Sequence, residues 1–276
     1  MTVTQAIQAA LALGVARLDA QGLLLHVLAR ASNDRGWLLA HGEDSMADTA
    51  ADRFKTLAAR CGLGEPLAYL TGWQPFYGLE LAVDARVLIP RPDTETLVDW
   101  ALAVIDLGTG SGAVLDLGTG SGAVALAVKH NRPKWRVRAT DASGEALAVA
   151  RANAVRLGLD VNFFEGNWFD ALPAGSGRFE LIASNPPYIA DHDTHLPALA
   201  HEPQQALTSG ADGLDGIRQV ISGAPAHLHA GGWLLLEHGF DQAAAVRDLL
   251  AASGFGQVQS RRDLAGIERC SGGQFG

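Results

Sequence analysis

The stretch whose residue types most clearly suggest chemistry is Ser184-Asn-Pro-Pro-Tyr188. Two consecutive prolines stiffen the backbone, because each ring fixes its own φ and restricts the residue before it. A stiff loop would hold the Asn185 side chain and the Pro186 carbonyl as fixed acceptors, with the Tyr188 ring beside them. Two such acceptors can bind both N–H groups of an amide or arylamine, orient its nitrogen toward an electrophilic methyl and stabilise the developing positive charge. The stretch therefore predicts group transfer to a planar NH₂.

A proline-rich turn without chemistry is the alternative interpretation, and it would be preferred for Pro186-Pro187 alone. The stretch, however, follows a predicted strand over Phe179–Ala183 and lies downstream of a glycine-rich loop. Parallel sheets bind their ligands at such strand ends. This placement favours the chemical interpretation.

The glycine-rich loop is Leu115-Asp-Leu-Gly-Thr-Gly-Ser-Gly122. Glycines let the backbone adopt positive φ and let a ligand approach the main chain closely. Both a dinucleotide loop (GxGxxG) and a methyltransferase loop (GxGxG) are possible, and the spacing of Gly118, Gly120 and Gly122 favours the second. Asp141 follows about 20 residues later, where a carboxylate would accept hydrogen bonds from both ribose hydroxyls. Loop and carboxylate together predict a site for an adenosyl cofactor.

An aromatic run, Gly166-Asn-Trp-Phe169, and Asp170 follow the next predicted strand. In a nucleotide-binding sheet they would border the adenine ring. Two roles are open for Trp168: stacking on the adenine, or packing in the core.

Alternating strands and helices are needed to position these residues, and the sequence predicts this alternation from about residue 101. The predicted strands are Ala113–Leu117, Val137–Thr140, Val161–Glu165, Phe179–Ser184 and Trp233–Glu237. The predicted helices are Val124–His130, Gly144–Leu157, Gly216–Leu228 and Gln242–Ser253. This order predicts a mostly parallel sheet with helices on both faces and ligands at the carboxyl ends of its strands.

The chain divides into three regions that differ in residue composition and in predicted secondary structure. Residues 1–65 carry leucines at helical spacing without β-branched runs, which predicts a small bundle that is helical throughout. Residues 66–92 are rich in aromatics, glycine and alternating apolar residues, which predicts a β-hairpin linker. The third region, residues 93–276, holds the predicted cofactor and catalytic motifs, and its first helix should be N-capped by Asp93 or Thr94.

A local duplication precedes the cofactor loop. Residues 105–114, IDLGTGSGAV, recur as residues 115–124, LDLGTGSGAV. Ten residues are too short a period for a repeat architecture. Residues 123–130 form a good helix after the second copy, whereas only Ala113–Leu117 separates the two glycine clusters. We therefore expect the second copy to bind the cofactor and the first to be a linker insertion.

Composition excludes several classes of protein. The 276 residues are 48% hydrophobic and 18% charged, which suits a folded core and excludes intrinsic disorder. The net charge of −9 comes without any Lys/Arg block, so no basic nucleic-acid face is visible. Two distant cysteines, and the absence of a signal peptide or a long apolar run, predict a cytoplasmic protein without a membrane span.

A group of histidines and aspartates, Asp191-His-Asp-Thr-His195 with His201, has the residue types of a metal site. Methyl transfer to an amide needs no metal, and solvated polar residues are ordinary in such a loop, so we expect no metal here. Glu202-Pro203 could instead buttress the substrate loop.

Taken together, the motifs resemble one enzyme family over essentially the whole chain. Asn185-Pro-Pro-Tyr188 resembles the signature of amino-methyltransferases that act on glutamine or on the exocyclic amines of adenine and cytosine. With the helical N-terminal region and the cofactor loop, three further motifs resemble the peptide chain release factor N5-glutamine methyltransferases: Glu65-Pro-Leu-Ala-Tyr-Leu-Thr-Gly72, Leu88-Ile-Pro-Arg-Pro-Asp-Thr-Glu95 and Leu235-Leu-Glu-His-Gly239.

The resemblance implies an α/β fold, a Rossmann-like class I methyltransferase domain with a seven-stranded sheet, behind a helical domain that docks the release factor. It implies S-adenosyl-L-methionine as cofactor, with contacts from Gly118, Thr119, Gly120, Ser121, Gly122, Asp141, Trp168 and Asn185. It also implies catalysis by Asn185, Pro186 and Tyr188, and a substrate glutamine held by Asn185, Pro186, Pro187 and Tyr188. That glutamine belongs to the Gly-Gly-Gln motif of class I release factors.

Two rival functions remain beside this one. An N6-adenine DNA or RNA methyltransferase would share the Asn-Pro-Pro-Tyr motif, but the negative net charge of the chain argues against direct nucleic-acid binding. A catalytically idle binding module would lack the loop or the asparagine, and both are present. The sequence also ends in Gly272-Gly-Gln274, which we interpret as a terminal strand and loop, not as a self-substrate. We expect a monomer.

Overall fold

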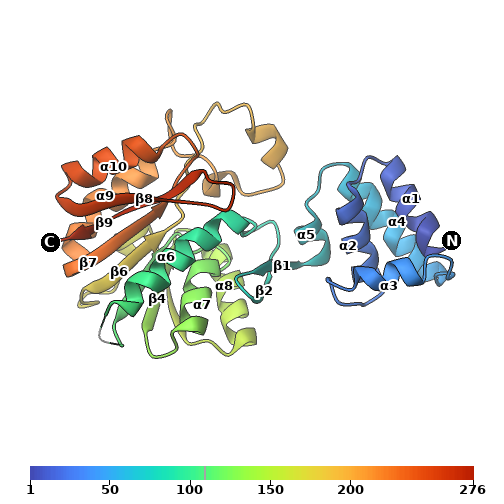
Figure 1. Cartoon of the computed structure of the whole chain (residues 1–276), viewed down its shortest axis with the longest axis horizontal. Helices are drawn as coiled ribbons and strands as arrows, with labels where there is room; N and C mark the ends of the chain where they lie inside the picture. Colours follow the sequence, from blue (N-terminus) through green and yellow to red (C-terminus); the bar gives the residue numbers. More distant parts are fainter. Residues whose placement is uncertain (109) are drawn as a thin grey trace. The chain divides into compact units, whose positions relative to one another are not determined.

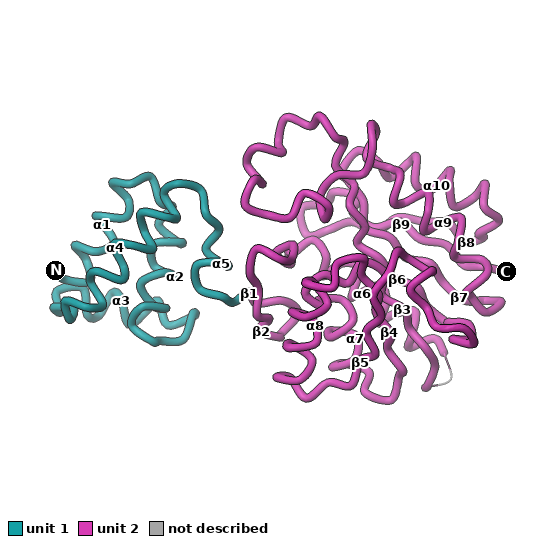
Figure 2. The backbone as a smooth tube through the Cα atoms, turned by 180° about the vertical axis from the view of Figure 1, so that it is seen from behind, with its two compact units in different colours: residues 1–73 teal, residues 74–276 magenta. Residues whose placement is uncertain are grey.

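The computed structural model describes residues 1–108 and 110–276, which divide into two compact units, residues 1–73 and 74–276 (Figure 2). Thr109, in the first copy of the duplicated decapeptide, lies outside the described residues.

Unit 1 is built from helices around a leucine-rich core. They are α1 (Val3–Ala12), α2 (Arg17–Val27), α3 (Arg35–Ala40), α4 (Asp48–Gly62) and α5 (Leu67–Thr71). Leu23, Leu24 and Phe54 are fully or almost fully buried in its centre. A capping box starts α1, because the Thr2 hydroxyl accepts the Gln5 N–H at 3.3 Å and the Gln5 side chain accepts the Thr2 N–H at 2.9 Å. The predicted helical bundle is confirmed.

Two local expectations for this region are wrong. Residues 1–65 are not helical throughout: α1, for example, ends where Gly14 adopts φ +82°, a common way for glycine to stop a helix. Residues 67–71, expected in the hairpin, form α5 instead. Pro66 stands at its N-cap and Gly72, with φ +80°, ends it. A short apolar run with proline before it and glycine after it indicates a helix. The aromatic residues of the neighbouring sequence obscured this signal.

The hairpin itself is present but short. It consists of β1 (Trp73–Phe76) and β2 (Leu79–Ala82), which form a separate two-stranded sheet. Tyr77 and Gly78 connect them with φ values of +48° and +75°. Positive φ at both central residues is the geometry of the tight turns that match the twist of paired strands.

Unit 2 contains the seven-stranded sheet, in the order β5-β4-β3-β6-β7-β9-β8. Its strands are β3 (Ala113–Leu117), β4 (Arg136–Asp141), β5 (Val161–Glu165), β6 (Phe179–Ser184), β7 (Leu228–Glu237), β8 (Phe255–Arg262) and β9 (Glu268–Phe275). The pairings from β5 to β7 are parallel, and β9 is antiparallel to both of its neighbours. The predicted α/β fold with a mostly parallel sheet is confirmed.

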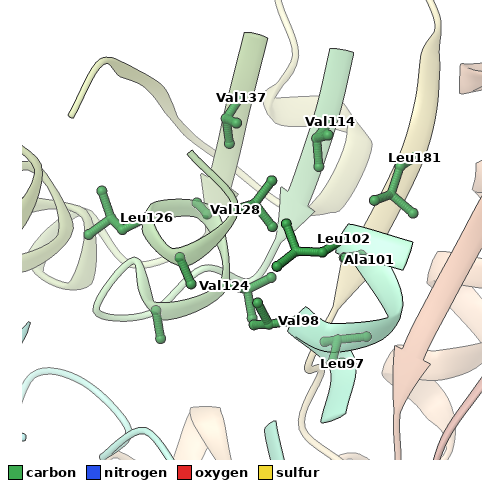
Figure 3. Close-up of a cluster of buried hydrophobic side chains, with 14 of the residues drawn as sticks. Leu97, Val98, Ala101, Leu102, Val114, Val124, Leu126, Val128, Val137 and Leu181 are labelled. Carbon is green, nitrogen blue, oxygen red and sulfur yellow. The ribbon is translucent and has the colours of Figure 1, made fainter. Parts of the chain in front are cut away.

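Helices cover both faces of this sheet (Figure 1). They are α6 (Glu95–Asp106), α7 (Ala123–Asn131) and α8 (Gly144–Leu157) on one face, and α9 (Asp215–His227) and α10 (Ala243–Ala252) on the other. Side chains alternate along the strands, so Val114 and Leu181 pack toward the first group (Figure 3), whereas Leu115 and Ile182 pack toward the second. Strands buried on both faces explain why these segments are almost continuously apolar.

The edge of the sheet departs from the sequence-based expectation. β8 was not predicted, because Phe255-Gly-Gln-Val-Gln-Ser-Arg-Arg262 is mostly polar and lies at the exposed margin, where hydrophobic periodicity is weak. β7 is longer than the predicted Trp233–Glu237, since it starts at Leu228 and passes an irregularity in its pairing with β6. In the described part of the chain, no helix has both the length and the apolar character to cross a membrane.

Candidate active site

The largest concentration of predicted site residues surrounds a cavity of about 200 Å³ in unit 2. Its walls come from the loops that follow the carboxyl ends of β3, β4, β5 and β6. The chain leaves β3 toward β4 on one side and returns to β6 on the other, and ligands bind at such a reversal of strand order. Of the predicted residues, it is lined by Gly118, Gly120, Asp141, Trp168, Asn185 and Pro187.

The loop after β3 is held in shape by the neighbouring strand. The Gly118 and Thr119 N–H groups both donate to the Thr140 carbonyl at 2.9 Å. Gly120 adopts φ +56° and donates its N–H to Asp141 Oδ2 at 2.8 Å. The glycine loop and the predicted ribose-binding carboxylate are therefore directly joined.

Asp141 stands at the end of β4 with both oxygens engaged. Oδ1 accepts the Ser143 N–H at 2.9 Å, and Oδ2 accepts the Gly120 N–H. Burial raises the pKa of this carboxyl, while the two backbone hydrogen bonds act in the opposite direction. Each carboxylate oxygen can accept a second hydrogen bond, so capacity remains for two hydroxyl groups.

Three predicted loop residues face inward, away from the cavity. Thr119 and Ser121 are buried, and the Thr119 hydroxyl donates to Asp116 Oδ2 at 2.6 Å. Gly122 has φ +88°, and a Cβ there would lie 2.9 Å from Leu126 Cδ1, so this glycine permits close helix packing. In the structure these residues shape the loop and do not line the cavity.

Asp116 holds the glycine loop to the start of α7, a role that the sequence reasoning missed. Its Oδ2 also accepts the Ala125 N–H, at 3.1 Å, in the first turn of α7. Burial raises the pKa of this carboxyl to about 6, against the effect of its hydrogen bonds to Thr119 and Ala125. Its position inside the apolar Leu-Asp-Leu run was the available signal, since a lone acid in a buried strand requires partners.

Trp168 packs against the core, as one of its two proposed roles requires, and it also lines the cavity. Its indole packs on Gly118 and Gly216, where an added Cβ would lie 3.5 Å and 3.3 Å from the ring. The same ring is half-buried, belongs to the core around α9 and lines the cavity. Its φ of +45° is unusual for a residue other than glycine and indicates a position fixed by its surroundings.

The Asn-Pro-Pro-Tyr loop begins where β6 ends. Asn185 lines the cavity and donates from Nδ2 to the hydroxyl of buried Thr94 at 3.2 Å. Tyr188 points its hydroxyl at Glu237 Oε1, at 3.2 Å. Among the described residues, neither Pro186 nor Tyr188 belongs to the cavity lining. Thr94 does cap α6 by position, but its side chain bonds outside the helix, contrary to the predicted capping role.

Glu237 is a second buried carboxyl group, next to Tyr188, to which the sequence reasoning gave no individual role. It ends β7 and is fully buried. Burial raises its pKa to about 7, while hydrogen bonding by the hydroxyls of Thr94 and Tyr188 lowers it. Burial and the nearby Glu237 raise the pKa of the Tyr188 hydroxyl, so that group keeps its proton.

A partly buried ion pair supports one wall of the cavity. Glu202 Oε2 accepts the Ile89 N–H at 3.1 Å, and Oε1 pairs with the Arg91 guanidinium. Glu202 thereby joins the Leu88–Pro92 segment to the long loop after β6, which supports the buttressing role suggested for Glu202-Pro203. Both segments contribute to the lining, the first through Leu88 and the second through Pro203, Gln205 and Ala206.

The other polar groups lie away from this arrangement. His195 and Asp193 pair with each other at 2.7 Å on the surface. Within residues 1–108 and 110–276, no group of three or more His, Cys, Asp and Glu side chains could hold a metal ion. Gly272-Gly-Gln274 lies inside β9, where Gln274 pairs with Trp233 at the amino end of the β7 pairing and Cys270 pairs with Glu237 at its carboxyl end. The sequence-level interpretation of this segment as a strand is confirmed.

A mostly parallel sheet with one antiparallel strand, a glycine loop after β3 and an acid after β4 define a class I methyltransferase domain. The comparisons agree: the family described as methyltransferase small domain matches residues 100–213, and the PrmC N-terminal domain matches residues 3–72. A release factor glutamine methyltransferase from Bordetella pertussis is 50% identical, over 94% of this chain and 95% of that protein. One from Xylella fastidiosa is 48% identical, over 94% of each. The chain belongs to the release factor glutamine methyltransferase family.

The comparison with solved structures supports the fold only. The Thermus thermophilus 16S rRNA N2 G1207 methyltransferase, in complex with AdoMet and guanosine, superposes with a TM-score of 0.55 at 18% identity. The match covers 74% of this chain and 50% of that one. The catalytic sheet is thus shared with an enzyme of different substrate class, so the fold does not by itself decide the acceptor.

Proposed function

We propose that the chain transfers a methyl group from S-adenosyl-L-methionine to the side-chain amide nitrogen (N5) of the glutamine in the Gly-Gly-Gln motif of class I release factors. The observation that carries this proposal is the position of Asn185, which lines the cavity while Thr94 fixes its amide. Membership of the family supports the choice of acceptor.

The residues around the cavity fit the cofactor. Asp141 keeps lone pairs for two ribose hydroxyls, Gly118 and Gly120 let a ligand approach the backbone, and the Trp168 ring borders the same space. When bound, the cofactor supplies an electrophilic methyl group on its sulfonium. We assign cofactor contacts to Gly118, Gly120, Asp141, Trp168 and Asn185, and a shaping role to Thr119, Ser121 and Gly122.

The chain's own contribution to the reaction is orientation. An amide nitrogen is a weak nucleophile because its lone pair is delocalised. The Asn185 side-chain oxygen and the Pro186 carbonyl would accept its two N–H groups, direct the nitrogen at the methyl and stabilise the developing positive charge. Pro187 would stiffen the loop, and Tyr188 would border the substrate from behind. The proton leaves after transfer, so no strong base is needed.

The division of labour along the chain is part of the same proposal. Residues 1–65 would dock the release factor, residues 66–92 would link, and residues 93–276 would carry out the transfer. We propose that the protein works as a monomer in the cytoplasm, where release factors meet ribosomes, without direct contact to nucleic acid.

The decisive experiment is incubation with radiolabelled cofactor and a purified release factor, followed by peptide mapping of the label. Label on the Gly-Gly-Gln glutamine supports the proposal, and label elsewhere or none contradicts it. Asn185→Ala is the matched control: it should bind cofactor within a few-fold of wild type and lose about 10²–10³ in rate. The adenine-methylating alternative predicts labelled oligonucleotide and steeply salt-dependent binding.

A further inference from the structure

Behind the Asn-Pro-Pro-Tyr loop lies a buried carboxyl group that the proposed reaction does not use. Glu237 is fully buried at the end of β7 and accepts the Tyr188 hydroxyl at 3.2 Å. The Thr94 hydroxyl lies near this carboxyl and lowers its pKa, and among the described residues the buried Glu237 Oε2 has no fully formed hydrogen bond. Thr94 in turn accepts the Asn185 Nδ2–H at 3.2 Å. Glu237 is therefore connected to both ends of the loop, to Tyr188 directly and to Asn185 through Thr94.

These hydrogen bonds have a defined direction. An ionised carboxylate can only accept hydrogen bonds, whereas a hydroxyl carries one hydrogen and two lone pairs. The buried Glu237 Oε2 needs a donor, and when the Thr94 hydrogen turns toward it, only lone pairs of Thr94 remain for Asn185. Asn185 must then donate from Nδ2, which leaves its Oδ1 for the opposite side. Because Asn185 lines the cavity, that oxygen is available to the reacting amine.

The charges around Glu237 keep it an acceptor under assay conditions. Arg269 on β9 lowers the pKa of this carboxyl and Asp93 raises it, and the value of about 7 leaves the group mostly ionised at pH 8. Arg269 is itself paired with Asp93 and with Asp263, each at 3.4 Å. Cys270, also packed nearby, is buried, and burial raises the pKa of its thiol well above the ordinary value, so it stays neutral.

We propose that Glu237 and Thr94 are positioning residues that set the orientation of the Asn185 amide, so that its oxygen and not its NH₂ faces the substrate nitrogen. The alternative orientation would present two donors to an amine that itself needs acceptors, and the substrate would be repelled from the reactive geometry. This inference rests on the proposed glutamine methylation for its catalytic consequence, although the orientation itself can be measured without any substrate.

The first test compares Thr94→Val with Thr94→Ser at pH 8, with release factor as substrate. Valine keeps the shape of threonine but removes the hydroxyl, whereas serine keeps the hydroxyl. Loss of an outer hydrogen-bonding partner commonly reduces activity about 10- to 100-fold. We expect that fall in kcat for valine, with KM for the cofactor within two-fold, and kcat near wild type for serine. Equal losses in both variants, or a change confined to KM, would overturn the proposal.

The second test observes the Asn185 side-chain amide by NMR in the free, nitrogen-15-labelled protein, assigned by its absence in Asn185→Ala. One of its two protons should exchange slowly in wild type and in Thr94→Ser, and quickly in Thr94→Val. Glu237→Gln, which offers donors as well as an acceptor, should also lose this protection and lower kcat about 10-fold. Unchanged exchange in Thr94→Val and Glu237→Gln refutes the orienting role. Failure of wild type to methylate the release factor would instead refute the proposed function.

Discussion

The two copies of the duplicated decapeptide, residues 105–114 and 115–124, have nearly the same sequence and different structures. They differ only in their first residue, Ile105 against Leu115. In the first copy, Ile105 and Asp106 end α6, and the last two residues begin β3. The second copy instead supplies the rest of β3, the cofactor loop and the start of α7. Flanking sequence, and not the motif itself, therefore decides which copy forms the glycine loop that lines the cavity.

The aspartates of the two copies show this most clearly. Asp106 is on the surface, where its hydrogen-bonded pair with Arg132 holds its pKa below the ordinary value. Asp116 is buried, and its pKa rises to about 6. The same residue in the same local sequence is thus shifted in opposite directions by its surroundings, so a motif match alone says little about chemistry.

The largest expected contrast is in cofactor binding. Gly110 and Gly120 have φ values of +86° and +56°, and a Cβ at either would meet no atom within 4 Å. Valine should therefore strain both backbones by about 1–2 kcal/mol. Only Gly120 lines the cavity, so Gly120→Val should weaken cofactor binding at least about 100-fold and Gly110→Val should leave it unchanged. Calorimetric titration measures both, and the reverse result would mean that the first copy binds.

The second largest contrast should be in how much Leu107 and Leu117, the third residues of the two copies, contribute to the free energy of unfolding. Leu117 is 0% exposed in the sheet, whereas Leu107 is 85% exposed. Leu117→Ala should lower the free energy of unfolding by about 2–5 kcal/mol, and Leu107→Ala should change it by less than about 0.5 kcal/mol. Urea unfolding of the two variants provides the measurement. Comparable losses would show that the first copy is packed in solution.

The aspartates should differ in the pH dependence of stability. Because folding raises the pKa of Asp116 from 3.8 to about 6, its contribution is full below the lower value and is lost as pH rises through the upper one. Relative to Asp116→Asn, wild type should lose on the order of 2–3 kcal/mol of unfolding free energy between these pH values. Asp106→Asn is the control. Folding lowers the pKa of Asp106, so the stability that Asp106 contributes is lost as pH falls, the opposite direction to Asp116. Parallel pH profiles in all three proteins would contradict the difference in burial.

The smallest expected contrast comes from alanine at the first glycine of each copy. Gly118 has φ +71°, whereas Gly108 does not adopt the left-handed region. Gly118→Ala should cost roughly 1 kcal/mol of stability, and Gly108→Ala should cost less, since its added Cβ meets only the Ile105 carbonyl oxygen closely, at 3.3 Å, without backbone strain. Thermal unfolding of both variants checks this, and equal shifts in Tm would argue that backbone conformation is not what separates the copies.

Much of the fold followed from local pattern. The strand Ala113–Leu117 was predicted with its observed bounds, because a buried parallel strand is an almost continuous apolar run between turn signals, here interrupted only by Asp116. Asp141 and Asn185 were expected to lie together for a related reason, since one ends β4, the other follows β6, and the carboxyl ends of parallel strands share one edge; both line the cavity. Where position along the chain fixes position in space, sequence reasoning succeeded.

The missed residues depend on contacts between distant segments. Thr94 and Asn185 are 91 positions apart, and Glu202 meets Arg91 across 111 positions. Glu237 looked like the polar end of a strand, and nothing beside it indicates that Tyr188 lies within hydrogen-bond distance. Tyr188 and Glu237 meet because β6 and β7 are adjacent in the sheet, which hydrophobic periodicity does not reveal.

The central position of β3 has a consequence for folding kinetics. This strand pairs with β4 and with β6, whose residues lie far along the chain, so its hydrogen bonds form only after long loops close. A slip of ten residues would offer those neighbours an almost identical strand, Ile105-Asp-Leu107, in place of Leu115-Asp-Leu117. Such a slipped pairing would satisfy much of the local sequence but would unwind the last turn of α6. The duplication thus supplies the folding chain with a competing register, and the helix that precedes it selects against that register.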